Sequence, residues 1–170
     1  MWRAACLALL LMGPAGASTW QALLPQARIV GQGEFRWFGF RIYEASLWSE
    51  AGEVSPARPF ALQLRYLTAI GREQFVERSI AEIEHLHPEL PRDQLHTTWR
   101  GWMRQAFVDV SSGDTLTGVY LPGRGARFFF GDRQTAAIDD DAFARAFFDI
   151  WLSPNTRAPS LRKALLGGAR

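Results

Sequence analysis

Hydrophobic and polar positions alternate with a period of two in the first half of the chain, a pattern that predicts β-strands. The clearest case is 60–66, where Phe, Leu, Leu and Tyr alternate with Ala, Gln and Arg, typical of a half-buried strand. Before it, the aromatic-rich stretch 31–48 predicts either two strands or one long bent strand. Because aromatic side chains fall on both of its faces, we expect both faces to be at least partly buried. Phe35 and Trp37 would face one way, and Phe38, Phe40 and Ile42 the other.

The middle of the chain changes to a helical period. Segment 72–87 repeats hydrophobic residues every three or four positions, and a second such segment begins near Pro91, a residue suited to the first turn of a helix. We expect both stripes to face the core. The first stripe is Val76, Ile80, Ile83 and His87, and the second is Leu95, Trp99, Trp102, Met103, Ala106 and Val110.

The last third predicts a β-hairpin or meander followed by two helices. Short strands at 115–121, 127–130 and 135–138 are separated by glycine-containing turns. Asp139 or Asp140 can cap the next helix, whose stripe we interpret as core, with Phe147 and Trp151 as its anchors. A last helix begins at Pro159. The order of elements predicts an α+β fold, with a mainly antiparallel sheet covered by helices on one face.

The first 17 residues are typical of a signal peptide. Arg3 precedes the apolar run 4–12, which is too short to span a bilayer, and small residues follow at 15–17. We expect cleavage before Ser18, export to the periplasm or the medium, and one domain over 18–170. Cys6, the single cysteine, would be lost with this segment, so the mature domain would be held together by its core alone.

Composition excludes several classes of function. Hydrophobic residues make up 48% of the chain, which is typical of a globular domain. Removal of Arg3 changes the formal charge from +2 to +1, that is, 18 basic against 17 acidic residues, and the basic residues are scattered. Nucleic acid is therefore not an expected partner. The three histidines lie at 85, 87 and 96 without the spacing of a zinc site, and no nucleophile motif surrounds any serine, so we predict no metal and no cofactor.

Several short segments resemble the bacterial chalcone isomerase-like family. They are Gly33 with 38–48 (FGFRIYEASLW), 60–67 (FALQLRYL), 112–118 (SGDTLTG), and 143–152 followed by Pro154 and 165–167. The resemblance implies an open-faced β-sandwich, in which a large antiparallel sheet wraps over a layer of helices. This agrees with the α+β prediction.

The resemblance also identifies where catalytic residues would lie. The plant enzymes of this family cyclise a chalcone with an arginine in the first strand pair, and with a tyrosine, a lysine and an asparagine along the first long helix. Here the arginine position falls on Phe35, one residue before Arg36, and the tyrosine position falls on Phe75. Arg78 stands for the lysine and Glu82 for the asparagine. We therefore expect no chalcone isomerase activity.

Some plastid members of the family bind fatty acids, so the resemblance implies a non-catalytic protein that binds a small apolar ligand. The predicted signal peptide adds that this protein is exported. The ligand would lie between the sheet and the helix that begins near Arg72, in a tunnel with a cation near its entrance. The candidate ligand-binding residues are Tyr43, Arg65, Phe75, Arg78 and Glu82, with Arg41 as a further candidate cation.

Two alternatives remain open. The first is an envelope interaction protein without a ligand, in which Trp99, Trp102, Phe147 and Trp151 would fill the space between sheet and helices. The second is an isomerase- or lyase-type enzyme of unknown substrate, with a site among Tyr43, Arg65, Tyr66 and Arg78.

Overall fold

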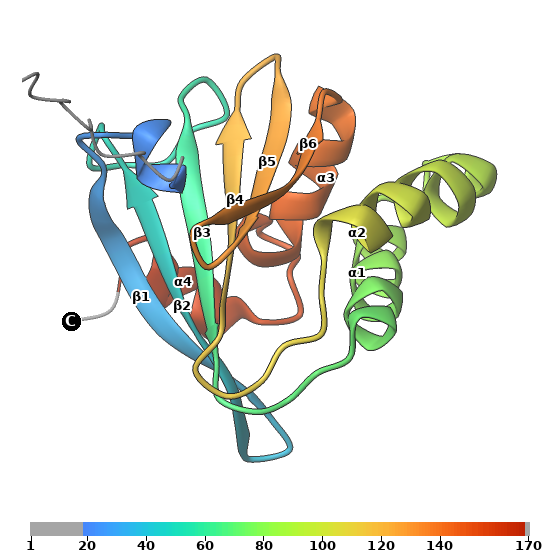
Figure 1. Ribbon diagram of the computed structural model, residues 1–170, viewed down its shortest axis with the longest axis horizontal. Helices are drawn as coiled ribbons and strands as arrows, with labels where there is room; N and C mark the ends of the chain where they lie inside the picture. Colours follow the sequence, from blue (N-terminus) through green and yellow to red (C-terminus); the bar gives the residue numbers. More distant parts are fainter. Residues whose placement is uncertain (1–18, 169–170) are drawn as a thin grey trace, which may run out of the picture.

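The computed structural model describes residues 19–168, which form one antiparallel sheet with helices packed on it (Figure 1). Each strand pairs with the next one along the chain, so the sheet is a six-stranded meander. The strands are β1 (Arg28–Trp37), β2 (Phe40–Ser49), β3 (Phe60–Tyr66), β4 (Thr115–Leu121), β5 (Gly125–Phe130) and β6 (Arg133–Ile138). The predicted α+β fold is confirmed, and the stretch 31–48 forms two strands. The predicted signal peptide lies outside the described residues.

The helices cover one face of the sheet. In Figure 1, α3 lies behind β4 to β6, while α1 and α2 stand to one side. Asp140 accepts a hydrogen bond from the Phe143 backbone N–H at 2.7 Å, which identifies it as the predicted cap of α3. The helices are α1 (Arg72–Leu86), a π-helical turn η2 (Gln94–Trp99), α2 (Arg100–Ala106), α3 (Asp141–Leu152) and α4 (Pro159–Leu165), and a short 3₁₀ helix η1 (Trp20–Ala22) precedes the sheet.

The main hydrophobic core lies between the helices and the inner face of the sheet. The predicted stripe of α3 lies within it, with Phe143 fully buried and Phe147 and Trp151 nearly so. A second, smaller core lies on the outer face, where Trp20 and Leu24 from the leading segment cover part of β3, β4 and β5. The outer face of the sheet is therefore partly covered by a segment that has no clear hydrophobic period.

Two sequence-based predictions are wrong in detail. The helix that begins near Pro91 ends at Ala106, and Val110 instead forms an isolated β-bridge with Ile70. Phe38 and Phe40 are not partly buried: they are 86% and 74% exposed, because the turn between β1 and β2 projects beyond the helical layer.

Gly31 and Gly33 allow α4 to approach β1 closely. A Cβ atom at Gly31 would lie 2.2 Å from the Ala164 carbonyl oxygen, and one at Gly33 would lie 2.7 Å from Leu161 Cδ1. The backbone contact at Gly31 leaves no room for a side chain, whereas a side chain at Gly33 would require α4 side chains to shift. In the described part of the chain, no helix has the length and apolar character needed to cross a membrane.

Candidate ligand-binding cavity

The structure contains a cavity of about 760 Å³ between α1 and the half of the sheet formed by β1, β2 and β3. It exists because α1 packs mainly against α3, η2 and α2 and makes few contacts with these strands. The volume is within the roughly 300–1,000 Å³ typical of small-molecule sites.

The walls of the cavity are largely apolar and aromatic. The Phe35 and Tyr43 rings stack at 5.1 Å on the strand side, and Tyr66 contacts Phe75 of α1 edge-to-face at 6.0 Å. A register shift between β1 and β2 places Ile42 and Tyr43, which are adjacent in sequence, both on the cavity. The remaining apolar lining residues are Trp37, Ala69, Ile70, Ile150, Trp151 and Ala158.

One wall carries a cluster of three charged side chains. The Glu82 carboxylate is 8% exposed and pairs with Arg78 at 2.7 Å and with Arg157 at 3.4 Å. Both arginines are about half exposed, so they reach from the buried carboxylate toward solvent. Since one carboxylate faces two guanidinium groups, the cluster keeps a net positive charge.

Trp37 and Arg78 meet across the rim of the cavity. The Arg78 guanidinium carbon lies 4.6 Å from the centre of a Trp37 ring, a cation–π distance. Trp37 comes from the end of β1 and Arg78 from α1, and each is 46% exposed. This contact therefore joins the strand side and the helix side of the cavity where it opens to solvent.

Two tyrosine side chains line the cavity. Tyr43 accepts a hydrogen bond from Trp151 Nε1 at 3.0 Å, whereas the buried Tyr66 hydroxyl has no hydrogen-bond partner within residues 19–168. Burial raises the pKa of both phenols well above the usual value. Both side chains therefore stay neutral near pH 7.

Four of the five predicted ligand-binding residues lie together. Tyr43, Phe75, Arg78 and Glu82 all line the cavity. Arg65 does not: its guanidinium pairs with Glu44 at 2.6 Å.

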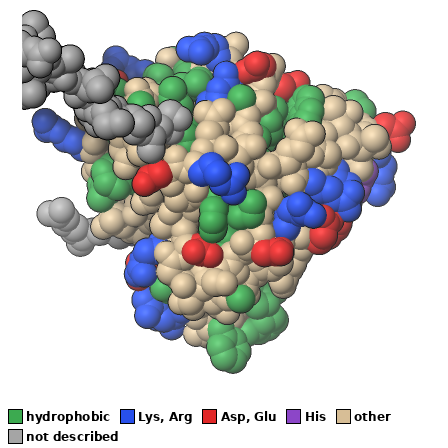
Figure 2. Space-filling model, viewed as in Figure 1, with side chains coloured by type: hydrophobic (Ala, Val, Ile, Leu, Met, Phe, Trp, Pro, Cys, Tyr) green, Lys and Arg blue, Asp and Glu red, His purple; other side chains and the backbone are tan. Residues whose placement is uncertain are grey.

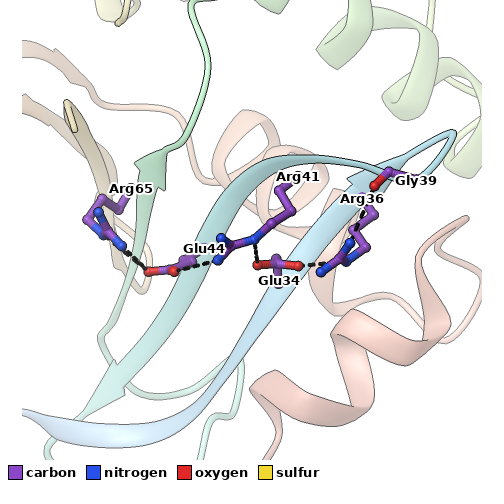
Figure 3. A network of polar contacts seen from close by, with 6 residues as sticks. All are labelled: Glu34, Arg36, Gly39, Arg41, Glu44 and Arg65. Atoms are coloured by element: carbon purple, nitrogen blue, oxygen red, sulfur yellow. Dashed lines mark hydrogen bonds and ion pairs between the residues drawn. The ribbon is translucent and has the colours of Figure 1, made fainter. Parts of the chain in front are cut away.

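The location of Arg65 follows from strand alternation. In Figure 3, Arg65, Glu44, Arg41, Glu34 and Arg36 form a row of ion pairs across β1, β2 and β3. Tyr66 lines the cavity, so its neighbour Arg65 points to the opposite face of β3. Arg41 belongs to the same row and likewise does not line the cavity.

The space between sheet and helices is filled in one half and open in the other. Trp99 is fully buried, and the Phe143 ring packs edge-to-face on both Trp99 and Trp102. Trp151 lies at the boundary: it packs on Phe147 at 5.3 Å, yet it also lines the cavity. The interpretation of Trp151 as a core anchor alone is therefore incomplete.

Sequence reasoning missed Arg157, which lies in the connection between α3 and α4. That segment has no periodic pattern, and only the fold brings it beside Glu82, 75 residues earlier in the chain. Phe35 and Phe75, which stand where the catalytic arginine and tyrosine were expected, both line the cavity. Among the described side chains, no group of three or more His, Cys, Asp or Glu is placed to hold a metal ion.

A sequence profile of the chalcone isomerase-like family matches residues 29–167, which is most of the chain. The chain belongs to this family. It is 34% identical over 139 residues to an uncharacterized protein of Haemophilus influenzae, a match that covers 81% of this chain and 67% of the relative. The crystal structure of a fatty-acid binding protein from Arabidopsis thaliana has the same fold, with a TM-score of 0.63 at 10% identity, over 84% of this chain and 87% of that one. This chalcone isomerase-like domain therefore has a relative in bacteria and a structural counterpart in plants.

Proposed function

We propose that this chalcone isomerase-like protein binds an apolar molecule with a single anionic head group, such as a fatty acid, in the cavity beneath α1. The observation that carries the proposal is the combination of an aromatic cavity with a net positive Arg78–Glu82–Arg157 cluster in its wall. An alkyl chain would lie against Phe35, Phe75 and the other apolar side chains. A carboxylate would pair with the guanidinium groups, as charge-assisted hydrogen bonding favours.

The size of the cavity supports a ligand over the ligand-free alternative. An interaction protein without a ligand would need the space between sheet and helices to be filled by aromatic side chains. Those side chains fill only the half beneath α3, and about 760 Å³ stays open beside them. The structural counterpart from Arabidopsis thaliana is described as a fatty-acid binding protein, which supports the same class of ligand.

The chemistry of the cavity favours binding over catalysis. Neither Phe35 nor Phe75 has a charge or a proton to offer, and both cavity tyrosines have raised pKa values. A neutral tyrosine can hold a ligand oxygen but cannot take up a proton, so neither hydroxyl is suited to act as a base near neutral pH. We further propose that the protein is exported, because its first 17 residues are typical of a signal peptide. N-terminal sequencing of periplasmic protein tests that part, and recovery of Met1 would contradict it.

Displacement of a fluorescent fatty acid tests the ligand proposal. We expect saturable binding at micromolar protein and a roughly 10- to 100-fold weaker affinity in Arg78→Gln, because a charge-assisted hydrogen bond contributes about 1.5–3 kcal/mol. This substitution leaves Glu82 paired with Arg157, so it does not strand a buried carboxylate.

Arg65→Gln is the matched control, because it removes an arginine that pairs with a glutamate on the opposite face of the sheet. Its affinity is expected to equal that of the wild type. Ala158→Trp, which places a large side chain in the cavity wall, is expected to abolish binding. Native mass spectrometry of protein purified from its own periplasm should show a copurified lipid. Absence of saturable binding, or equal losses in Arg78→Gln and Arg65→Gln, would overturn the proposal.

A further inference from the structure

The hairpin between β1 and β2 ends in exposed aromatic side chains. Phe38 is 86% exposed, Phe40 74% and Trp37 46%, and they are among the few large hydrophobic side chains on the described surface. This hairpin is the lowest part of the molecule in Figure 1, and Figure 2 shows hydrophobic side chains gathered at that end. We call Trp37, Phe38 and Phe40 the aromatic tip.

The backbone of the aromatic tip has an unfavourable conformation at Phe38. Phe38 has φ +47° and Gly39 has φ +85°, so both central residues of the two-residue turn are left-handed. Such turns favour asparagine, aspartate or glycine at the first position. Phe38 is the one described non-glycine residue with positive φ. A bulky side chain held in a disfavoured conformation and fully in solvent points to a role outside folding.

Two arginines lie directly behind the aromatic tip. The Arg36 guanidinium donates to the Gly39 carbonyl at 3.3 Å, so it reaches across the base of the turn. Arg36 and Arg41 share the Glu34 carboxylate, with Arg36 at 2.7 Å (Figure 3). Arg41 also pairs with Glu44, which pairs in turn with Arg65, so the row behind the tip has three guanidinium groups for two carboxylates and keeps a net positive charge.

The shape of the tip fits a lipid surface better than a protein partner. Taking about 200 Å² for each aromatic side chain, the exposed area is on the order of 400 Å². That is about half of what each partner contributes to a standard protein interface. A narrow apolar projection with cations behind it instead matches the bilayer, where tryptophan and arginine lie at head-group level and phenylalanine reaches the acyl chains.

We propose that the aromatic tip docks the protein on an anionic lipid surface, with Phe38 and Phe40 inserted and with Arg36 and Arg41 at the level of the head groups. The site extends beyond the ligand cavity but adjoins it, because Arg36 and Trp37 also line the cavity. Docking does not depend on a ligand in the cavity, so the two proposals can fail separately.

Co-sedimentation with vesicles tests the docking. The test uses the protein as purified from its host, after its N-terminus has been sequenced. It is mixed either with phosphatidylglycerol–phosphatidylcholine vesicles or with vesicles of phosphatidylcholine alone. We expect binding to the anionic vesicles that weakens with salt, since surface charge attraction is screened. Phe38→Asn should reduce the partition constant about tenfold or more, because a buried phenylalanine side chain contributes at least that factor.

Phe38→Asn keeps the test independent of folding. Asparagine suits the left-handed turn, so the variant should unfold at the same or a higher denaturant concentration than the wild type. Leu23→Ser is the matched control: Leu23 is 40% exposed next to η1, near the opposite end of β1, and its loss should leave vesicle binding unchanged. Vesicle binding that survives in Phe38→Asn, or that falls equally in Leu23→Ser, would overturn the proposal. So would failure of the wild type to sediment with either vesicle, or a wild-type dimer that Phe38→Asn converts to a monomer.

Discussion

Removal of the Tyr66 hydroxyl should stabilise the protein, although the residue is almost fully buried. Tyr66 is 1% exposed, and its hydroxyl has no hydrogen-bond partner within the described residues. A buried polar group without a partner costs about 1–3 kcal/mol. Tyr66→Phe deletes only that oxygen and keeps the ring contacts with Tyr43 and Phe75, at 5.9 and 6.0 Å. We expect the free energy of unfolding to rise by about 1 kcal/mol.

Tyr43→Phe is the matched control with the opposite sign. The Tyr43 hydroxyl accepts the Trp151 Nε1–H at 3.0 Å, and Trp151 is 4% exposed. The variant leaves that indole N–H without a partner, so the free energy of unfolding should fall by about 1–3 kcal/mol. The two substitutions delete the same atom from adjacent rings, so the difference in sign isolates the hydrogen bond.

Urea denaturation of ligand-free protein measures both effects. With a slope of about 2 kcal/mol per molar urea, a change of about 1 kcal/mol moves the midpoint by roughly 0.5 M. A clearly lower midpoint for Tyr66→Phe would show that the hydroxyl has a partner in solution and would refute the reasoning.

Three further results are expected. Gly31→Ala should destabilise the fold, because its Cβ would lie 2.2 Å from a backbone carbonyl oxygen. Gly101→Ala in α2, where a Cβ would have no atom within 4 Å, should stabilise the fold by about 0.5–1 kcal/mol. Equal urea midpoints for the two variants would contradict this. Phe147→Ala should lower the free energy of unfolding by about 3–5 kcal/mol, and an unchanged midpoint would show that α3 faces another way. All three tyrosines have raised pKa values, so the folded state holds their protons more tightly than the unfolded state. The free energy of unfolding should then fall as the pH rises above about 10, and phenolate absorbance should appear together with loss of the near-ultraviolet circular dichroism. Phenolates that form while the dichroism persists would refute this coupling of titration to unfolding.

The fold could be predicted from the sequence because its signals are local. Alternation over 60–66 and the helical stripe of 143–151 each fix a buried face without knowledge of the rest of the chain. The turn at 38–39 was missed because phenylalanine is unusual where the chain needs positive φ, so the sequence lacks the usual Asn-Gly signal. The end of the helix at Ala106 was missed because Val110 continues the hydrophobic period while its backbone pairs with Ile70.

The cavity could be predicted only in part, because it depends on packing between distant segments. Phe75, Arg78 and Glu82 were identified through the family resemblance, and they lie together because they are on consecutive turns of one helix. Arg65 was expected in the cavity because the sequence alone does not show which face of β3 is the inner one. Tyr66 lines the cavity, so the neighbouring Arg65 lies on the outer face. Arg157 lies in the irregular connection between α3 and α4, where neither the strand period nor the helical period of hydrophobic residues applies.

One short hairpin joins the two proposed sites. Phe35 and Trp37 turn into the cavity, while Phe38 and Phe40 project from the turn into solvent. The Arg78 guanidinium lies over Trp37 but is not itself part of the aromatic tip, so Arg78→Gln should weaken fatty-acid binding and leave vesicle binding intact. Phe38→Asn should do the reverse, since Phe38 does not line the cavity. If either variant lost both activities while remaining folded, the cavity and the tip would be one binding site, with the lipid surface itself as the ligand, and the two proposals would have to be replaced by that single one.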